Sequence, residues 1–164
     1  MQIIHYLFSK VEKSIKICKF LDGLQDNEND DVDAIKLFFL VSHAEIAMND
    51  FGNTGTKKEL VEKFFEPVAD DLKFNIKLTL DEVEKGISMT FADILYKVRC
   101  DYAHEGNYTG KIFKSKKDKK CLHNIFSFHD MGDLIFAESA LTYKAFIKIY
   151  MRALTEHIKI YSKF

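Results

Sequence analysis

The chain has 164 residues, of which 47% are hydrophobic and 30% are charged, and its formal net charge is −1. This composition excludes a disordered protein, and the length predicts a single domain, residues 1–164, with a sizeable core. The near-zero net charge excludes a general attraction to nucleic acid, so such binding would depend on local patches of charge.

The cysteines and the N-terminus indicate a cellular compartment. Cys18, Cys100 and Cys121 are odd in number and widely spaced, which favours a reducing environment without a disulfide framework. The N-terminus lacks the pattern of a signal peptide, and the longest apolar run, residues 37–41, is far too short for a membrane span. We therefore expect a cytoplasmic protein with no membrane partner.

The first third of the chain predicts two helices joined by an acidic stretch. Residues 2–22 place apolar side chains on one stripe and lysines on the other side. Residues 22–33 indicate either a solvated loop or a cation site, although they lack the spacing of a calcium loop. Residues 32–50 are apolar almost all round, interrupted by His43 and Glu45, which is typical of a helix central to a bundle or to a subunit interface.

Two capping-box spacings predict the next helices. Thr56-x-x-Glu59 opens a helix over residues 56–72, which Pro67 should kink or end. The same spacing predicts a short helix over residues 79–86.

The rest of the chain completes a predicted helical bundle. A further helix is capped by Ser88 or Thr90, and residues 133–162 predict one long helix with a polar stripe. Between these helices, residues 111–115 and 121–128 flank a lysine-rich middle and indicate a hairpin or an irregular excursion. The expected fold class is all-α, an up-and-down bundle of about five helices, with a small hairpin as the open alternative.

Common metal and cofactor motifs are missing from the sequence. It contains no H-E-x-x-H, no Glu-x-x-His pair, no phosphate-binding glycine loop and no G-x-S-x-G. Cys121, His123 and His129 form only a loose cluster that does not supply four ligands at the spacing of a structural zinc site. We therefore expect no metal and no cofactor.

The strongest functional signal is a helix that ends in ionisable residues. Arg99, Asp101, His104 and Glu105 stand at its end, before Gly106, which suits a helix C-terminus. The apolar positions before and among them recur at helical spacing: Phe91, Ile94, Leu95, Val98 and Tyr102.

Helical geometry limits which of these residues act together. At about 100° per residue, Arg99 and His104 differ by about 140°, so they converge on one ligand only if the helix ends near Ala103. Asp101 shares a face with His104, and it would either orient that imidazole or pair with a lysine.

Arginine and histidine together suit the cleavage of RNA without a metal. Arginine binds phosphate, and histidine exchanges protons near neutral pH. Attack by the 2′-hydroxyl needs both a base and an acid, which one histidine does not comfortably supply. A two-fold dimer would bring together two copies of His104 and of Arg99, so the chemistry predicts a homodimer.

Arg99-Cys100-Asp101-Tyr102-Ala103-His104 resembles the R-x(4–6)-H motif of the HEPN superfamily, and Glu105-Gly106 resembles its usual continuation. The resemblance implies a homodimeric helical bundle, and many such proteins are metal-independent endoribonucleases of toxin–antitoxin or other defence systems. It also implies that Arg99 stabilises the phosphate and that His104 is the acid or base. Other members are binding modules without catalysis, whose partner is a nucleotide, a peptide or a protein.

The sequence departs from the family pattern at two positions. Cys100 stands where the family often has Asn, Asp or His, which bears on catalytic competence. Gly106 stands where the subgroup modified by a nucleotidyltransferase has Tyr, so we do not predict that partnership. An antitoxin or another protein partner stays an open expectation.

A lysine-rich segment follows the motif. It indicates either a solvated loop tip or an arm that tracks RNA phosphates beside the cleft, with aromatic residues stacking on bases. The candidate RNA-binding residues are Lys111, Lys114, Lys116, Lys117 and Tyr108.

Overall fold

A computed structural model describes residues 31–105, 111–114 and 122–161, together with helical residues scattered between 5 and 20. Most of the apolar stripe expected over residues 2–22 and most of the acidic stretch lie outside the described residues, but Ile15 of the stripe is described and packs against the core. In chain order the elements are α2 (Asp31–Asp50), α3 (Lys57–Phe65), the 3₁₀ turn η1 (Glu66–Val68), α4 (Ala69–Lys73), β1 (Ile76–Leu78), α5 (Leu80–Glu84), α6 (Phe91–Glu105), β2 (Asn124–Asp130), β3 (Asp133–Ser139) and α7 (Tyr143–Tyr161).

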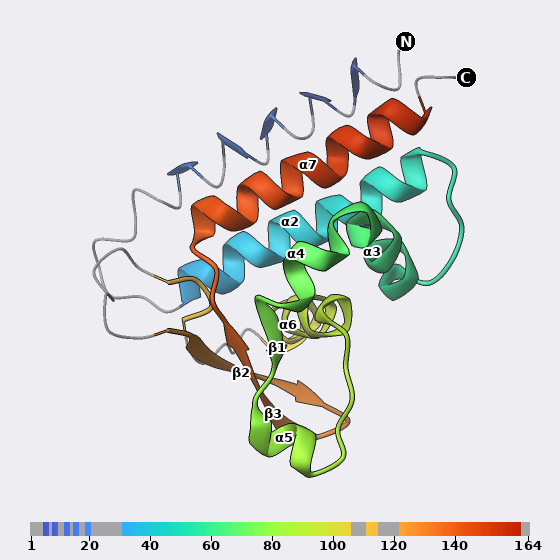
Figure 1. The fold of residues 1–164 in the computed structure, drawn as a ribbon. Helices are drawn as coiled ribbons and strands as arrows, with labels where there is room; N and C mark the ends of the chain where they lie inside the picture. The colour runs from blue at the N-terminus through green and yellow to red at the C-terminus, as the bar shows by residue number, and fades with distance from the viewer. Residues whose placement is uncertain are drawn as a thin grey trace.

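Helices α2, α3, α4 and α7 gather at one end of a small sheet, and the short helix α5 lies at its other end (Figure 1). Helix α6 lies between α2 and the sheet, since it contacts both α2 and β2. Helix α2 also packs against α3, and α7 contacts both α3 and η1. Helix α6, which carries the motif, is therefore central to the fold.

The all-α prediction was wrong, because three strands form an antiparallel sheet in the order β1-β3-β2. A hairpin is present, and its first strand, β2, overlaps the expected arm 121–128, but the partner of β2 is β3 and not residues 111–115. Strand β3 also takes the first part of the segment expected to be one long helix, so that α7 begins only at Tyr143.

The sequence of the hairpin explains this outcome. Met131 and Gly132 link the strands with φ angles of 51° and 94°, and positive φ at both central residues is the requirement of a two-residue type I′ turn. In β3, Ile135 and Ala137 are buried whereas Leu134 and Phe136 are exposed, which is the two-residue period of a half-buried strand.

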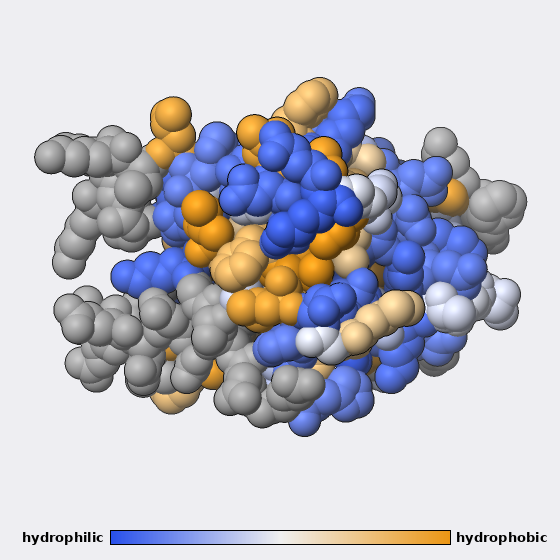
Figure 2. Space-filling model, turned by 90° about the horizontal axis from the view of Figure 1, so that it is seen from below, coloured by the Kyte–Doolittle hydropathy of each residue, from blue (hydrophilic) through white to orange (hydrophobic). Residues whose placement is uncertain are grey.

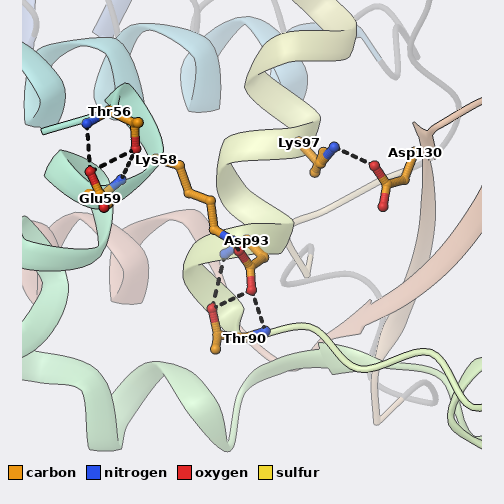
Figure 3. Close-up of polar contacts among 7 residues, drawn as sticks. All are labelled: Thr56, Lys58, Glu59, Thr90, Asp93, Lys97 and Asp130. Atoms are coloured by element: carbon orange, nitrogen blue, oxygen red, sulfur yellow. Dashed lines mark hydrogen bonds and ion pairs between the residues drawn. The ribbon is translucent and has the colours of Figure 1, made fainter.

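Local signals predicted the helices well. Helix α2 matches its prediction, and the capping box at Thr56 and Glu59 is formed, with Thr56 N–H donating to Glu59 Oε2 at 2.6 Å (Figure 3). Pro67 lies in η1, where α3 gives way to α4. The prediction of a capping box at Thr79 was wrong, because the Thr79 side chain makes no cap hydrogen bond at the start of α5.

The buried side chains form one core rich in aromatic residues. Phe64, Phe65 and Tyr150 pack together with ring centroids 4.9 to 6.2 Å apart. Two buried histidines in this core have polar partners: His43 Nδ1 lies 2.7 Å from the Tyr150 hydroxyl, and His157 Nε2 lies 3.0 Å from the Phe64 carbonyl oxygen. Such pairing offsets the cost of burying polar atoms.

The outer face of the sheet is partly apolar. Ile125, Leu134 and Phe136 are exposed on it. The face of the molecule seen from below also shows hydrophobic residues gathered at its centre among hydrophilic ones (Figure 2). In the described ranges, no helix combines the length and the apolar character needed to cross a membrane.

Candidate site at the C-terminal end of helix α6

Helix α6 begins with a strong cap that fixes its position. Thr90 and Asp93 form a reciprocal box, with Asp93 N–H donating to Thr90 Oγ1 at 3.1 Å and Thr90 N–H donating to Asp93 Oδ2 at 2.9 Å (Figure 3). Lys58 of α3 pairs with Asp93 Oδ1 at 2.5 Å. Partial burial opposes ionisation of Asp93, but these hydrogen bonds and the Lys58 charge hold the pKa of its carboxyl below the usual value.

The side of α6 that carries Arg99 faces α2. Arg99 Nε lies 3.0 Å from Glu45 Oε1, and Nη2 donates to Glu45 Oε2 at 3.3 Å. Nε also lies 3.3 Å from Ser42 Oγ, and the guanidinium carbon is 5.6 Å from the centroid of the Phe38 ring. The exposed fractions of the Arg99 and Glu45 side chains are only 13% and 9%. The guanidinium is thus held in a fixed orientation on α2.

The environment of Glu45 is electrostatically costly. Burial raises the pKa of its carboxyl, and the nearby positive charge of Arg99 opposes this rise. A buried carboxylate loses its hydration, which disfavours the charged form, while an opposite charge within a few ångströms favours it. The charge of Arg99 therefore offsets part of the cost of burying the Glu45 carboxylate, and Glu45 in turn orients the Arg99 guanidinium.

The side of α6 that carries Asp101 faces β2. Asp101 is 8% exposed, and its Oδ2 accepts the backbone N–H of His129 at 2.7 Å. The same oxygen lies 3.1 Å from His129 Nδ1. Lys97, one turn earlier, pairs with Asp130 at the end of β2 (Figure 3). Asp101 does orient an imidazole, but it is that of His129 and not that of His104.

His104 lies exposed in the last turn of α6. The helix continues through Glu105, so it does not end near Ala103 as the convergence of Arg99 and His104 requires. Within one chain the two residues remain about 140° apart around the axis. The described contacts therefore do not bring Arg99 and His104 together.

The predicted RNA-binding residues are only partly described. Lys111 is exposed, and Lys114 Nζ donates to the Leu122 carbonyl oxygen at 2.8 Å. Lys116, Lys117 and Tyr108 lie outside the described residues. The aromatic residue between the two described lysines, Phe113, is buried in the core and so is not available to stack on a base.

Sequence reasoning missed three residues of this region: Ser42, Glu45 and His129. A signal for Glu45 was present, because a carboxylate in a helix that is apolar almost all round needs a partner. His129 gave no such signal, since it lies just beyond the predicted hairpin arm 121–128 and is 28 positions from its partner Asp101. Comparison of the chain with family models, with curated proteins and with solved structures found no match.

Proposed function

We propose that this protein is a HEPN-like, metal-independent endoribonuclease that acts as a homodimer at the C-terminal end of α6. The observation that carries the proposal is the exposed imidazole of His104 in the last turn of the same core helix that holds Arg99. The spacing of the two residues matches the R-x(4–6)-H motif. A defence or toxin role is part of the same proposal.

The reaction assigns a role to each residue. His104 transfers a proton during attack of the 2′-hydroxyl on the adjacent phosphate, and Arg99 stabilises the charge that builds on the phosphate oxygens. The Glu45 and Ser42 contacts fix the guanidinium before the substrate binds, which lowers the cost of reorganisation in the reaction. Pairing about a two-fold axis would bring one copy's Arg99 toward the other copy's His104.

A non-catalytic binding module is the second candidate function. The low exposure of Arg99 and its ion pair with Glu45 favour it, because a guanidinium already bound by a carboxylate is a weaker phosphate ligand. The ligand in that case would be a nucleotide, a peptide or a protein bound at the same end of α6.

RNA cleavage in the presence of EDTA separates the two functions. We expect the wild-type protein to leave 2′,3′-cyclic phosphate ends, and His104→Ala and Arg99→Lys to lower the rate by about 10²-fold or more. Lysine keeps the charge of Arg99 but loses the forked geometry. Intact RNA together with a retained small ligand would support the binding module instead.

A further inference from the structure

Three charged or titratable residues of α6 lie on one side of the helix. Lys97, Asp101 and His104 follow each other at spacings of four and three, which places them within about 60° of one another. Lys97 contacts Asp130, and Asp101 contacts His129, so this side faces β2. His104 stands on the same side, about 4.5 Å further along the helix axis than Asp101.

The contact between Asp101 and His129 fixes both the position and the tautomer of an imidazole. A carboxylate oxygen only accepts hydrogen bonds, so Nδ1 of His129 carries the hydrogen that points to Asp101. Proton exchange with a substrate then uses Nε2. Asp101 is 8% exposed, whereas the His129 side chain is 41% exposed. A buried carboxylate behind an accessible imidazole is the arrangement by which enzymes orient a catalytic histidine.

We propose that His129 is the second proton-transfer residue of the ribonuclease site, that it acts with His104 of the same chain, and that Asp101 is its positioning residue. This inference rests on the proposed function and extends it. It answers the chemical objection that one histidine does not comfortably act as both base and acid.

The step balances with two imidazoles and no other reactant. One neutral imidazole takes the proton of the 2′-hydroxyl, and O2′ forms a bond to phosphorus. The bond between phosphorus and O5′ breaks, and the second, protonated imidazole gives its proton to O5′. The products are a 2′,3′-cyclic phosphate and a 5′-hydroxyl, and a second copy of the chain is not needed to supply an imidazole.

Charged groups from three elements lie near His129. Helix α6 contributes Lys97 and Asp101, and Asp130 follows His129 on β2. Asp133 of β3 is paired in register with Asp130. The ammonium of Lys97 pairs with Asp130 (Figure 3), and the Asp101 carboxylate lies in direct contact with the imidazole.

The test compares His129→Asn with His123→Asn in RNA cleavage. The asparagine amide at position 129 can still donate to Asp101 but exchanges no proton. His123 is a matched control, since it is 39% exposed just before β2 and its Nδ1 lies 3.9 Å from Glu138 Oε2 of β3. We expect His129→Asn to lower kcat/KM by about 10²- to 10⁴-fold and to remove one limb of its pH profile. His123→Asn should stay within about two-fold of the wild type.

A modified RNA identifies which histidine is the acid. Sulfur in place of the leaving O5′ gives a thiolate that departs without a proton, so a variant lacking only the acid regains cleavage of this substrate. We expect one of His104→Ala and His129→Asn to regain it, and the other not. Asp101→Asn should lower kcat on ordinary RNA more than it changes KM, because it disturbs the tautomer of His129.

The outcomes separate this inference from the proposed function. If His104→Ala is inactive while His129→Asn cleaves like the wild type with both limbs of the pH profile, the inference fails and the proposed function stands. A slower His129→Asn with an unchanged profile would mean a structural role for His129, and would also overturn the inference. If the wild-type protein cleaves no RNA, both are overturned.

Discussion

At the scale of single residues, the pair of Arg99 and Glu45 links stability to the candidate site. Removing one member of a buried ion pair leaves the other charge uncompensated, which typically costs several kcal/mol. We expect Arg99→Ala to lower the free energy of unfolding by about 3 kcal/mol. Urea unfolding followed by circular dichroism measures this. A loss below about 0.5 kcal/mol would show that Glu45 does not depend on Arg99.

The pKa of Glu45 predicts a pH dependence of stability. Burial raises this pKa from its ordinary value of 4.5, so the folded protein keeps the proton to a higher pH than the unfolded chain does. The stabilising effect of this protonation is complete below the unfolded pKa and is lost as the pH rises through the folded one. The variant Glu45→Gln has no ionisable carboxyl at this position. The stability of the wild type relative to Glu45→Gln should therefore fall as the pH rises above 4.5, and a flat difference in unfolding free energy would contradict this.

At the scale of elements, two threonines that each precede an acidic residue by three positions differ in their contacts. Thr90 forms a reciprocal capping box with Asp93, whereas Thr79 makes no cap hydrogen bond with its side chain. We expect Thr90→Ala to destabilise the protein by about 1 kcal/mol and Thr79→Ala by only a few tenths. Parallel urea titrations of the two variants provide the matched comparison, and equal losses would show that the contacts at Thr90 do not stabilise α6.

The helices could be predicted from the sequence because their signals are local. Helix α2 and the capping box at Thr56 depend on residues within a few positions of each other. Strand β3 could not be predicted in this way, since its short run of alternating residues leads into an apolar helical pattern. Strand β3 pairs along its whole length with the adjacent β2, and it also pairs with β1, which is some 60 residues away in the chain.

In the candidate site, too, local features could be predicted from the sequence and contacts between distant segments could not. Arg99, Asp101 and His104 were all found on one helix, as their spacing indicated. The contact partners of Arg99 and Asp101 could not be predicted, because Glu45 is 54 positions from Arg99 and His129 is 28 positions from Asp101. Which side of α6 faces α2 and which faces β2 is decided by the packing of distant segments.

At the scale of the whole molecule, the proposed homodimer needs a surface that a second copy can cover. The exposed apolar side chains Ile125, Leu134 and Phe136 lie on the outer face of the sheet. Sedimentation equilibrium should give twice the mass of one chain at concentrations where RNA is cleaved. Full cleavage activity from a strictly monomeric particle would contradict the dimer, but it would leave a site built from His104 and His129 of one chain intact.

We propose above all that the end of α6 cleaves RNA through His104 without a metal. The most direct measurement is the rate at which 2′,3′-cyclic phosphate ends appear on RNA in EDTA, for the wild type and for a folded His104→Ala variant. We expect steady formation of these ends by the wild type and a rate at least about 10²-fold lower for the variant. Equal rates for the two proteins, or no cleavage by either, would contradict it.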